Sequence, residues 1–145
     1  MTFEVIVDGV DRMTVDDGKD NRLGGGGQGE VYRVNYKGKN LALKWYTAKA
    51  ILQNDRFREN LLKNTRRESP DRCFVWPQHF VEDEKGGFGY LMDVIDTDRF
   101  VLFSNVYNGR RRVRNKKTGK KETVDVRFAS FEAELSAAIN LATAF

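Results

Sequence analysis

The sequence predicts an α+β fold, with an antiparallel sheet of about five strands and one main helix. Residues 30–36 and 40–46 are rich in β-branched and aromatic residues, flank a Tyr-Lys-Gly-Lys turn, and predict a β-hairpin. Helix formers with periodic apolar positions predict the main helix over about 47–65. Residues 74–81 and 88–95 flank a charged, glycine-containing turn and predict a second hairpin.

The two ends of the chain add further elements. Residues 3–7 predict a leading strand, and 16–21 predict a turn before the glycine-rich segment. Near the other end, apolar residues at helical spacing predict an amphipathic helix with Ser130 as its N-cap. That apolar stripe is still running at Phe145, without a helix stop signal. We therefore expect the sequence to be cut within a helix.

A glycine-rich segment followed by a lysine is the most specific signal. Residues 23–44 read L-G-G-G-G-Q-G-E-V-Y-R-V-N-Y-K-G-K-N-L-A-L-K. Glycines let a backbone approach phosphate oxygens because no Cβ stands in the way. A P-loop would need Lys and Ser or Thr after its last glycine, and a dinucleotide-binding fingerprint would open a helix. Glu30 and a predicted strand follow instead, which excludes both.

The pattern G-x-G-x-x-G-x-V over 24–31 and the stretch Leu41-Ala42-Leu43-Lys44 together resemble the amino-terminal, ATP-binding lobe of protein kinases. The resemblance spans about residues 20–98, with a weaker extension to 145. The stretches Phe74-Val75-Trp76-Pro77 and Ala137-Ala138-Ile139-Asn140-Leu141-Ala142 look similar to an atypical serine/threonine kinase-like branch. The kinase resemblance implies that the loop covers the phosphates of ATP, that Lys44 binds them, and that Val31 and Ala42 pack on the adenine. The implied binding residues are Gly24, Gly25, Gly26, Gly27, Gln28, Gly29, Val31, Ala42, Lys44, Glu59, Met92, Asp93, Val94 and Ile95.

Four of these residues would form the adenine pocket and the hinge. By the resemblance, Met92 would be the gatekeeper at the back of the pocket. Asp93 and Ile95 would present backbone groups to the edge of the base, with Val94 between them. Met92 also fits plain core packing, and both roles can hold.

The sequence leaves open which carboxylate pairs with Lys44. Kinases pair this lysine with a glutamate on the following helix, since a cation in a dry cleft benefits from an anion. Glu59 is the best-placed candidate, but it also lies four residues before Lys63, as in a solvated pair on a helix surface. Gln28 stands where the family often has an aromatic loop tip, which predicts a looser clamp.

The sequence lacks the remaining kinase machinery. Neither an H-R-D-x-x-x-x-N loop nor an Asp-Phe-Gly occurs, so we expect no catalytic residue and no metal ligand in this chain. We interpret 1–98 as the nucleotide-binding lobe and 99–145 as a basic hairpin insertion followed by the first helix of an absent lobe. A full-length parent would use ATP and Mg²⁺ to phosphorylate a protein substrate, whereas this piece alone would be inactive. One alternative is a pseudokinase, a regulatory module that senses nucleotide or docks a partner. Another is a nucleic-acid-binding module built on the basic cluster at 110–121.

Positive charge is concentrated in one segment. The net charge is +4, and eight cations fall between residues 110 and 121 around a predicted turn at 115–120. Such a cluster fits either contact with nucleic acid or another acidic partner, or a solvated hairpin tip. Because no aromatic side chains interleave with the charges to stack on bases, we expect the solvated tip and do not expect nucleic acid as a partner.

The remaining expectations concern location and assembly. The residues after Met1 do not resemble a signal peptide, and no apolar run approaches the roughly 18 residues of a membrane span. A single cysteine, Cys73, fits a reducing compartment. We expect a cytoplasmic protein without membrane contact. We also expect it to form homodimers through the exposed face of its last helix.

Overall fold

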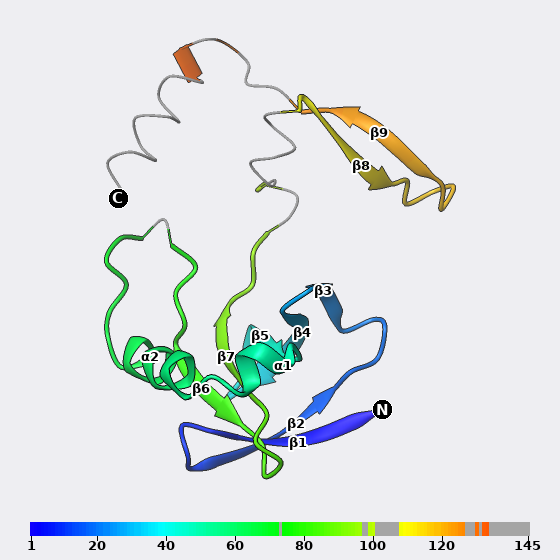
Figure 1. Cartoon of the computed structure of the whole chain (residues 1–145). Coiled ribbons are helices and arrows are strands. Elements are labelled where there is room, and N and C mark those ends of the chain that lie inside the picture. Colours follow the sequence, from blue (N-terminus) through cyan, green and yellow to red (C-terminus); the bar gives the residue numbers. More distant parts are fainter. Residues whose placement is uncertain (73, 97–98, 101–107, 127–129, 131, 134–145) are drawn as a thin grey trace. The chain divides into compact units, whose positions relative to one another are not determined.

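The computed structural model describes residues 1–72, 74–96, 99–100, 108–126, 130 and 132–133 (Figure 1). The chain forms two compact units, Met1–Val94 and Ile95–Phe145. The elements are β1 (Thr2–Val7), β2 (Asp11–Asp16), β3 (Arg22–Gly26), β4 (Gly29–Tyr36), β5 (Lys39–Tyr46), α1 (Lys49–Leu52), α2 (Asp55–Thr65), β6 (His79–Glu82), β7 (Phe88–Asp93), β8 (Arg110–Arg114) and β9 (Lys121–Asp125).

The predicted fold class is wrong. The described part of the chain is mostly β, with a 7-stranded antiparallel sheet, a separate 2-stranded sheet and two short helices of 4 and 11 residues. It is not a kinase lobe of five strands with one main helix. The strands predicted over 30–36 and 40–46 are confirmed as β4 and β5, so the error lies in the number of strands and in the helix.

Two local features explain the difference. The leading strand is one half of a hairpin, because Asp8 and Gly9 adopt positive φ angles of 51° and 74° and turn the chain back into β2. The single predicted helix is two helices, because Asn54 interrupts it. The Asn54 side chain accepts a hydrogen bond of 3.0 Å from the N–H of Phe57 and so caps the start of α2.

The predicted strand over 74–81 is too long. Only its last residues belong to β6, which begins at His79. The preceding segment is tied to the end of α2 by Trp76, whose Nε1 donates to the carbonyls of Asn64 and Arg67, both at 3.0 Å. An indole donor thus serves as a cap for the helix carbonyls.

The large sheet curls around an apolar core. Its strand order is β2-β1-β6-β7-β5-β4-β3, and β2 also contacts β4, which is not its neighbour in that order. Side chains on the inner face of the curl form the inner core: Val5, Val7, Met13, Val15, Val34, Tyr36, Leu41, Leu43, Val81 and Leu91. Burial of these side chains is the main force that holds the two ends of the sheet together.

The opposite, outer face of the sheet carries a second apolar cluster. Tyr46, Phe80 and Phe88 are buried there together with Leu61 of α2. Arg58 of α2 forms an ion pair with Glu82, which fixes the helix beside β6. The two helices therefore cover the outer face where these aromatic residues lie.

A polar contact closes the curl at the surface. The Asp11 carboxylate, at the start of β2, accepts hydrogen bonds of 2.6 Å from both the Tyr36 hydroxyl and the Lys37 ammonium. Lys37 has a positive φ of 50°, as the confirmed turn between β4 and β5 requires. Bonds from Lys37 and then Tyr36 hold the pKa of Asp11 below its ordinary value of 3.8.

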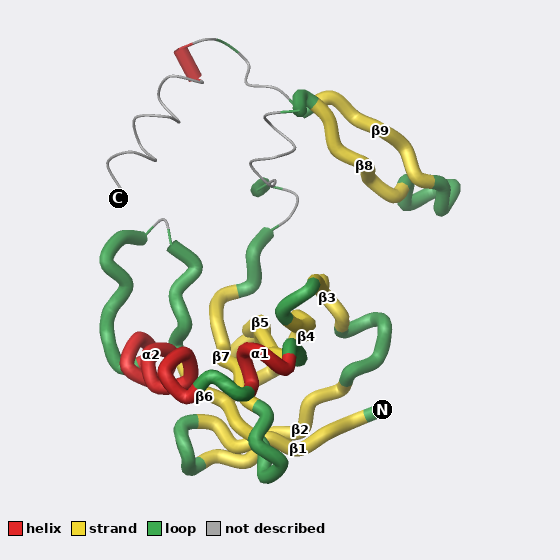
Figure 2. The backbone as a smooth tube through the Cα atoms, viewed as in Figure 1, coloured by secondary structure: helices red, strands yellow, loops and turns green. Residues whose placement is uncertain are grey.

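The second unit contains the predicted basic hairpin, β8 and β9 (Figure 2). The amphipathic helix predicted beyond residue 130, and with it the expected dimer surface, lies almost wholly outside the described residues. The Ser130 hydroxyl accepts a hydrogen bond of 3.2 Å from the N–H of Ala133, as an N-cap would.

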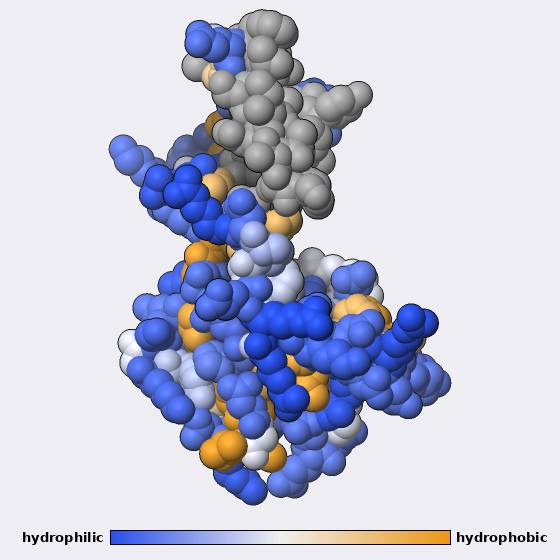
Figure 3. Space-filling model, turned by 90° about the vertical axis from the view of Figure 1, so that its left-hand side faces the viewer, coloured by the Kyte–Doolittle hydropathy of each residue, from blue (hydrophilic) through white to orange (hydrophobic). Residues whose placement is uncertain are grey.

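No described helix is long and apolar enough to cross a membrane. In the first unit, apolar residues reach the surface shown in Figure 3 only in separate spots.

Truncation of the inner core should lower stability strongly. Leu43 is 0% exposed, so Leu43→Ala should cost about 2–5 kcal/mol of the free energy of unfolding, measured by urea titration. Leu23→Ala, at a residue that is 40% exposed, should change it by less than about 0.5 kcal/mol. Equal effects of the two substitutions would contradict the described core.

The closing contact should make stability depend on acid pH. A lowered carboxyl pKa stabilises the fold above the ordinary value of 3.8, and this contribution is lost as pH falls through the folded value. The stability deficit of Asp11→Asn at pH 6 should therefore shrink below about pH 4. Asp20→Asn, at an exposed carboxylate without a bonding partner in the described chain, serves as the control and should show no such deficit. A deficit in Asp11→Asn that stays constant to pH 2 would contradict this account.

Candidate functional site

The glycine-rich segment forms a tight hairpin at the edge of the large sheet. β3 and β4 pair Gly26 with Gly29, which leaves Gly27 and Gln28 as the turn. Because β3 is the last strand of the sheet, one side of it presents backbone N–H and C=O groups without a partner strand among those that the structure describes.

Two contacts fix this hairpin. The Gln28 carbonyl accepts hydrogen bonds from the N–H groups of Thr47 and Ala48, at 3.0 and 3.2 Å. Across the hairpin, the Arg22 guanidinium forms an ion pair with the Glu30 carboxylate, which lies opposite Gly25. A hairpin held at its tip and along its strands does not behave as a flexible glycine linker.

The fold accounts for some of these glycines but not for others. A Cβ on Gly29 would stand 2.0 Å from the Trp45 carbonyl oxygen, so close strand packing excludes any side chain there. A Cβ on Gly24, Gly26 or Gly27 would meet no heavy atom within 4 Å, and the φ angles of these three residues lie outside the left-handed region. Neither sterics nor backbone conformation requires these three glycines, so their lack of side chains leaves open space over the backbone.

The strand register gathers the other predicted residues on the outer face. Lys44 lies opposite Val31 on one side and Tyr90 on the other, and Ala42 lies opposite Met92. Side chains of residues directly opposite each other in antiparallel strands point to the same face. Val31, Ala42, Lys44 and Met92 therefore share the face beside the glycine hairpin.

Lys44 is half-buried and forms no ion pair among the described residues, although the pKa of Glu30 is lowered mainly by Arg22 and further by the charge of Lys44. Its Nζ lies 3.5 Å from the carbonyl oxygen of Gly29 and 6.0 Å from the centroid of the Tyr46 ring. The carbonyl contact is at the limit of a hydrogen bond, so the ammonium group retains donors for a ligand.

Two tyrosines next to the lysine stay neutral at physiological pH. Burial raises the pKa of Tyr46, and its interaction with the neighbouring Tyr90 hydroxyl raises it further. Burial also raises the pKa of Tyr90. In this group of side chains Lys44 therefore supplies positive charge without a compensating phenolate.

The structure does not bring together every predicted residue. Glu59 is exposed on α2, and the described chain shows no ion pair from it to Lys44 or to Lys63. Asp93 is exposed, and its Oδ1 accepts a hydrogen bond of 2.8 Å from the Gln78 amide. Val94 ends the first unit and Ile95 begins the second, so the predicted hinge spans the boundary between them.

The sequence reasoning missed Arg33. This exposed residue lies opposite Ala42, on the same face as Val31, and adds a second cation to that face. The strand period of 2 could have identified it, since Arg33 follows Val31 by two residues in a predicted strand. Tyr90, two residues before Met92, was missed for the same reason.

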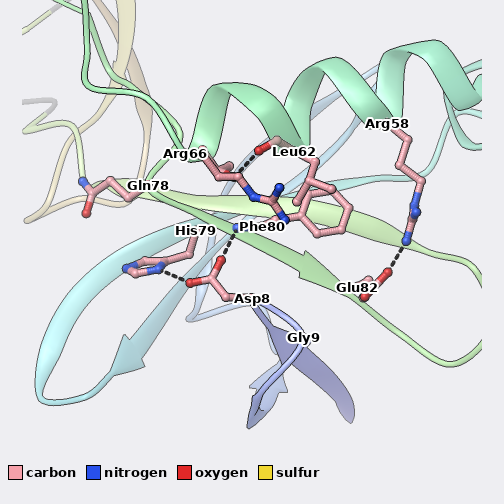
Figure 4. Close-up of a pocket in the computed structure, with 10 residues that line it drawn as sticks. Asp8, Gly9, Arg58, Leu62, Arg66, Gln78, His79, Phe80 and Glu82 are labelled. Carbon is pink, nitrogen blue, oxygen red and sulfur yellow. Dashed lines mark hydrogen bonds and ion pairs between the residues drawn. The ribbon is translucent and has the colours of Figure 1, made fainter.

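A hollow of about 500 Å³ lies elsewhere on the first unit, between α2, β6 and the turn after β1 (Figure 4). Its charged groups are largely satisfied by each other: His79 Nδ1 lies 2.6 Å from Asp8 Oδ2, and Arg58 pairs with Glu82. The N–H of Phe80 also donates to Asp8 at 3.0 Å. These bonds explain the hollow as a structural junction.

The described residues contain no group of three or more His, Cys, Asp or Glu that could hold a metal ion. Comparison of the chain with protein-family models, with curated proteins and with solved structures found no match. The function must therefore be inferred from the residues themselves.

Alanine substitutions at the glycines should fall into two classes by their effect on the stability of the fold. Gly26→Ala and Gly27→Ala meet no atom and should change the free energy of unfolding by no more than about 1 kcal/mol. Gly29→Ala forces a Cβ against the Trp45 carbonyl and should destabilise the fold by several times that amount. Thermal or urea unfolding of the three variants measures this, and a similar loss in all three would contradict it.

Proposed function

We propose that the glycine hairpin and Lys44 bind the phosphates of a nucleoside triphosphate, with ATP as the ligand that the sequence resemblance implies. The observation that carries the proposal is the conjunction of Gly24, Gly26 and Gly27, which the fold does not require, with a lysine on the adjacent face that forms no ion pair in the described chain. Backbone N–H groups without covering side chains and a nearby ammonium group are the donors that polyphosphates use.

The surroundings of Lys44 also suit a purine. Ala42 is buried and small, and the half-buried side chains of Val31 and Met92 lie on the same face, so a flat apolar ring has aliphatic surface to pack on. Arg33 adds a second cation near this surface. A ligand with an apolar ring and an anionic tail matches this distribution.

The proposal extends to the parent protein as the nucleotide-binding part of a phosphotransferase directed at protein Ser or Thr. Transfer requires a base for the acceptor hydroxyl and carboxylates for Mg²⁺. The described residues hold no cluster of three or more metal-binding side chains, so we assign neither role within them. In this chain the residues would bind and orient the triphosphate. A cytoplasmic location is also proposed, on the strength of the single cysteine.

A regulatory, nucleotide-sensing module is the second candidate. The exposed position of Glu59, without an ion pair to Lys44 in the described chain, favours it, since an active kinase pairs these residue types. Such a module would bind ATP without turnover. Phosphate release and phosphate transfer to a generic protein substrate, measured with the parent protein, distinguish the two candidates.

Replacement of the lysine should weaken ATP binding selectively. Lys44→Met removes a charge-assisted contact worth about 1.5–3 kcal/mol, so ATP affinity by isothermal titration should fall about 10- to 100-fold. Adenosine affinity should change little, because adenosine has no phosphates. Lys39→Met is the matched control, since Lys39 is an exposed lysine of the same strand, and it should retain ATP affinity.

A double substitution at Gly26 and Gly27 tests the proposed phosphate site independently of Lys44. Gly26→Ala with Gly27→Ala should leave the fold intact and reduce ATP affinity. If the wild-type chain binds ATP no better than adenosine, or if Lys44→Met and Lys39→Met behave alike, the proposed phosphate site is wrong.

A further inference from the structure

The basic cluster of the second unit is sorted by the register of its hairpin. Arg114 lies opposite Lys121, Arg112 opposite Thr123 and Arg110 opposite Asp125. Because opposite residues share a face and successive residues alternate, Arg110, Arg112, Arg114 and Lys121 lie on one face together with Thr123 and Asp125. We name this face, which carries four cations and one anion, the basic face. All four cationic side chains are exposed.

The opposite face of the hairpin has a different composition. Arg111 lies there opposite Val124, and Val113 lies opposite Glu122. On that face Arg111 and Glu122 balance each other in charge beside two valines. The sequence shows only a run of cations, whereas the register shows that the net positive charge lies on one face of the hairpin.

The turn that ends the hairpin is well defined. The Asn115 N–H donates to the Lys120 carbonyl at 2.8 Å, and the Asn115 side chain accepts from the N–H groups of Lys117 and Thr118 at 2.8 and 3.1 Å. Gly119 takes the positive φ of 69° that closes the turn. The strands are therefore held in register from the tip, and the exposed Lys116, Lys117 and Lys120 lie in the turn itself.

We propose that the basic face binds the phosphate backbone of a nucleic-acid duplex. Side chains two residues apart on a strand repeat every 6.6–6.8 Å, roughly, and so form a regular row of cations. A two-stranded ribbon is narrow enough to enter a major groove or to lie along a backbone. Arginine contributes three of the four cations, and its planar fork matches phosphate oxygens.

The composition of the basic face indicates which kind of polyanion it binds. Single strands are bound through aromatic side chains that stack on bases, and the basic face has none. A membrane surface favours apolar side chains beside the cations, and Val113 and Val124 lie on the other face. A duplex needs only charge in a regular row, so its binding here is largely independent of base sequence.

The test is salt-dependent binding of the whole 145-residue chain to a labelled 20-base-pair duplex, followed by fluorescence anisotropy. Four phosphate contacts predict a slope of about −3.6 in log K against log salt, or roughly a 150-fold loss of affinity from 50 to 200 mM. DNA and RNA duplexes serve as separate arms, and binding of either supports the proposal.

Two charge-matched variants provide the control. One replaces Arg110, Arg112, Arg114 and Lys121 with Gln; the other replaces four exposed cations of the first unit with Gln, namely Lys19, Lys39, Arg56 and Lys63. The first should abolish most of the salt slope, and the second should retain it. A third variant with Lys at the three arginines should keep the slope, since the charge remains.

Three results would overturn the proposal. Equal loss in the two charge-matched variants would show attraction by net charge alone. A single strand bound more tightly than a duplex would exclude the backbone-row geometry. Capture by vesicles of phosphatidylserine and phosphatidylcholine, without duplex binding, would assign the face to a membrane surface instead.

Discussion

The register between β4 and β5 is the constraint on which both the fold and the candidate site depend. The strand period is 2, so a slip of one residue would turn every side chain of β5 to the other face. Leu41 and Leu43 are buried in the inner core, which fixes the register. Lys44 must then point to the outer face, opposite Val31. The position of the lysine is thus set by the packing of its apolar neighbours.

The two faces of the sheet have different roles: the inner face holds the core, and the outer face carries the residues of the proposed binding site. The inner face is closed by the curl, with Asp11 holding β2 to the turn after β4. The outer face is covered by helices at Tyr46 and Phe88, and beside Tyr46 it carries a half-buried lysine that forms no ion pair in the described chain. Burial of a cation without an anion costs free energy, which a bound phosphate would offset. The glycine hairpin at the sheet edge adds backbone donors to that position.

Local patterns allowed prediction of the strands around the site but not of the complete fold. Alternation and turn residues identified β4 and β5, because both signals are short-range. The hairpin of β1 and β2 was missed because Asp8 adopts a conformation that glycine usually supplies, and the break at Asn54 was missed because capping residues also occur within helices. For the candidate site, spacing singled out Lys44 and the glycines as proposed binding residues. Arg33 and the exposed position of Glu59 depend on register and packing, which local spacing does not reveal.

The central claim is that the glycine hairpin and Lys44 face a common phosphate site. Amide NMR spectra of the ¹⁵N-labelled chain, recorded during titration with ATP and separately with adenosine, test it most directly. The account predicts that ATP shifts the amide signals of residues 24–29 and of those around Lys44, and that adenosine leaves the signals of 24–29 in place. Shifts confined to the junction of Asp8 and His79, or no shifts with millimolar ATP, would contradict it.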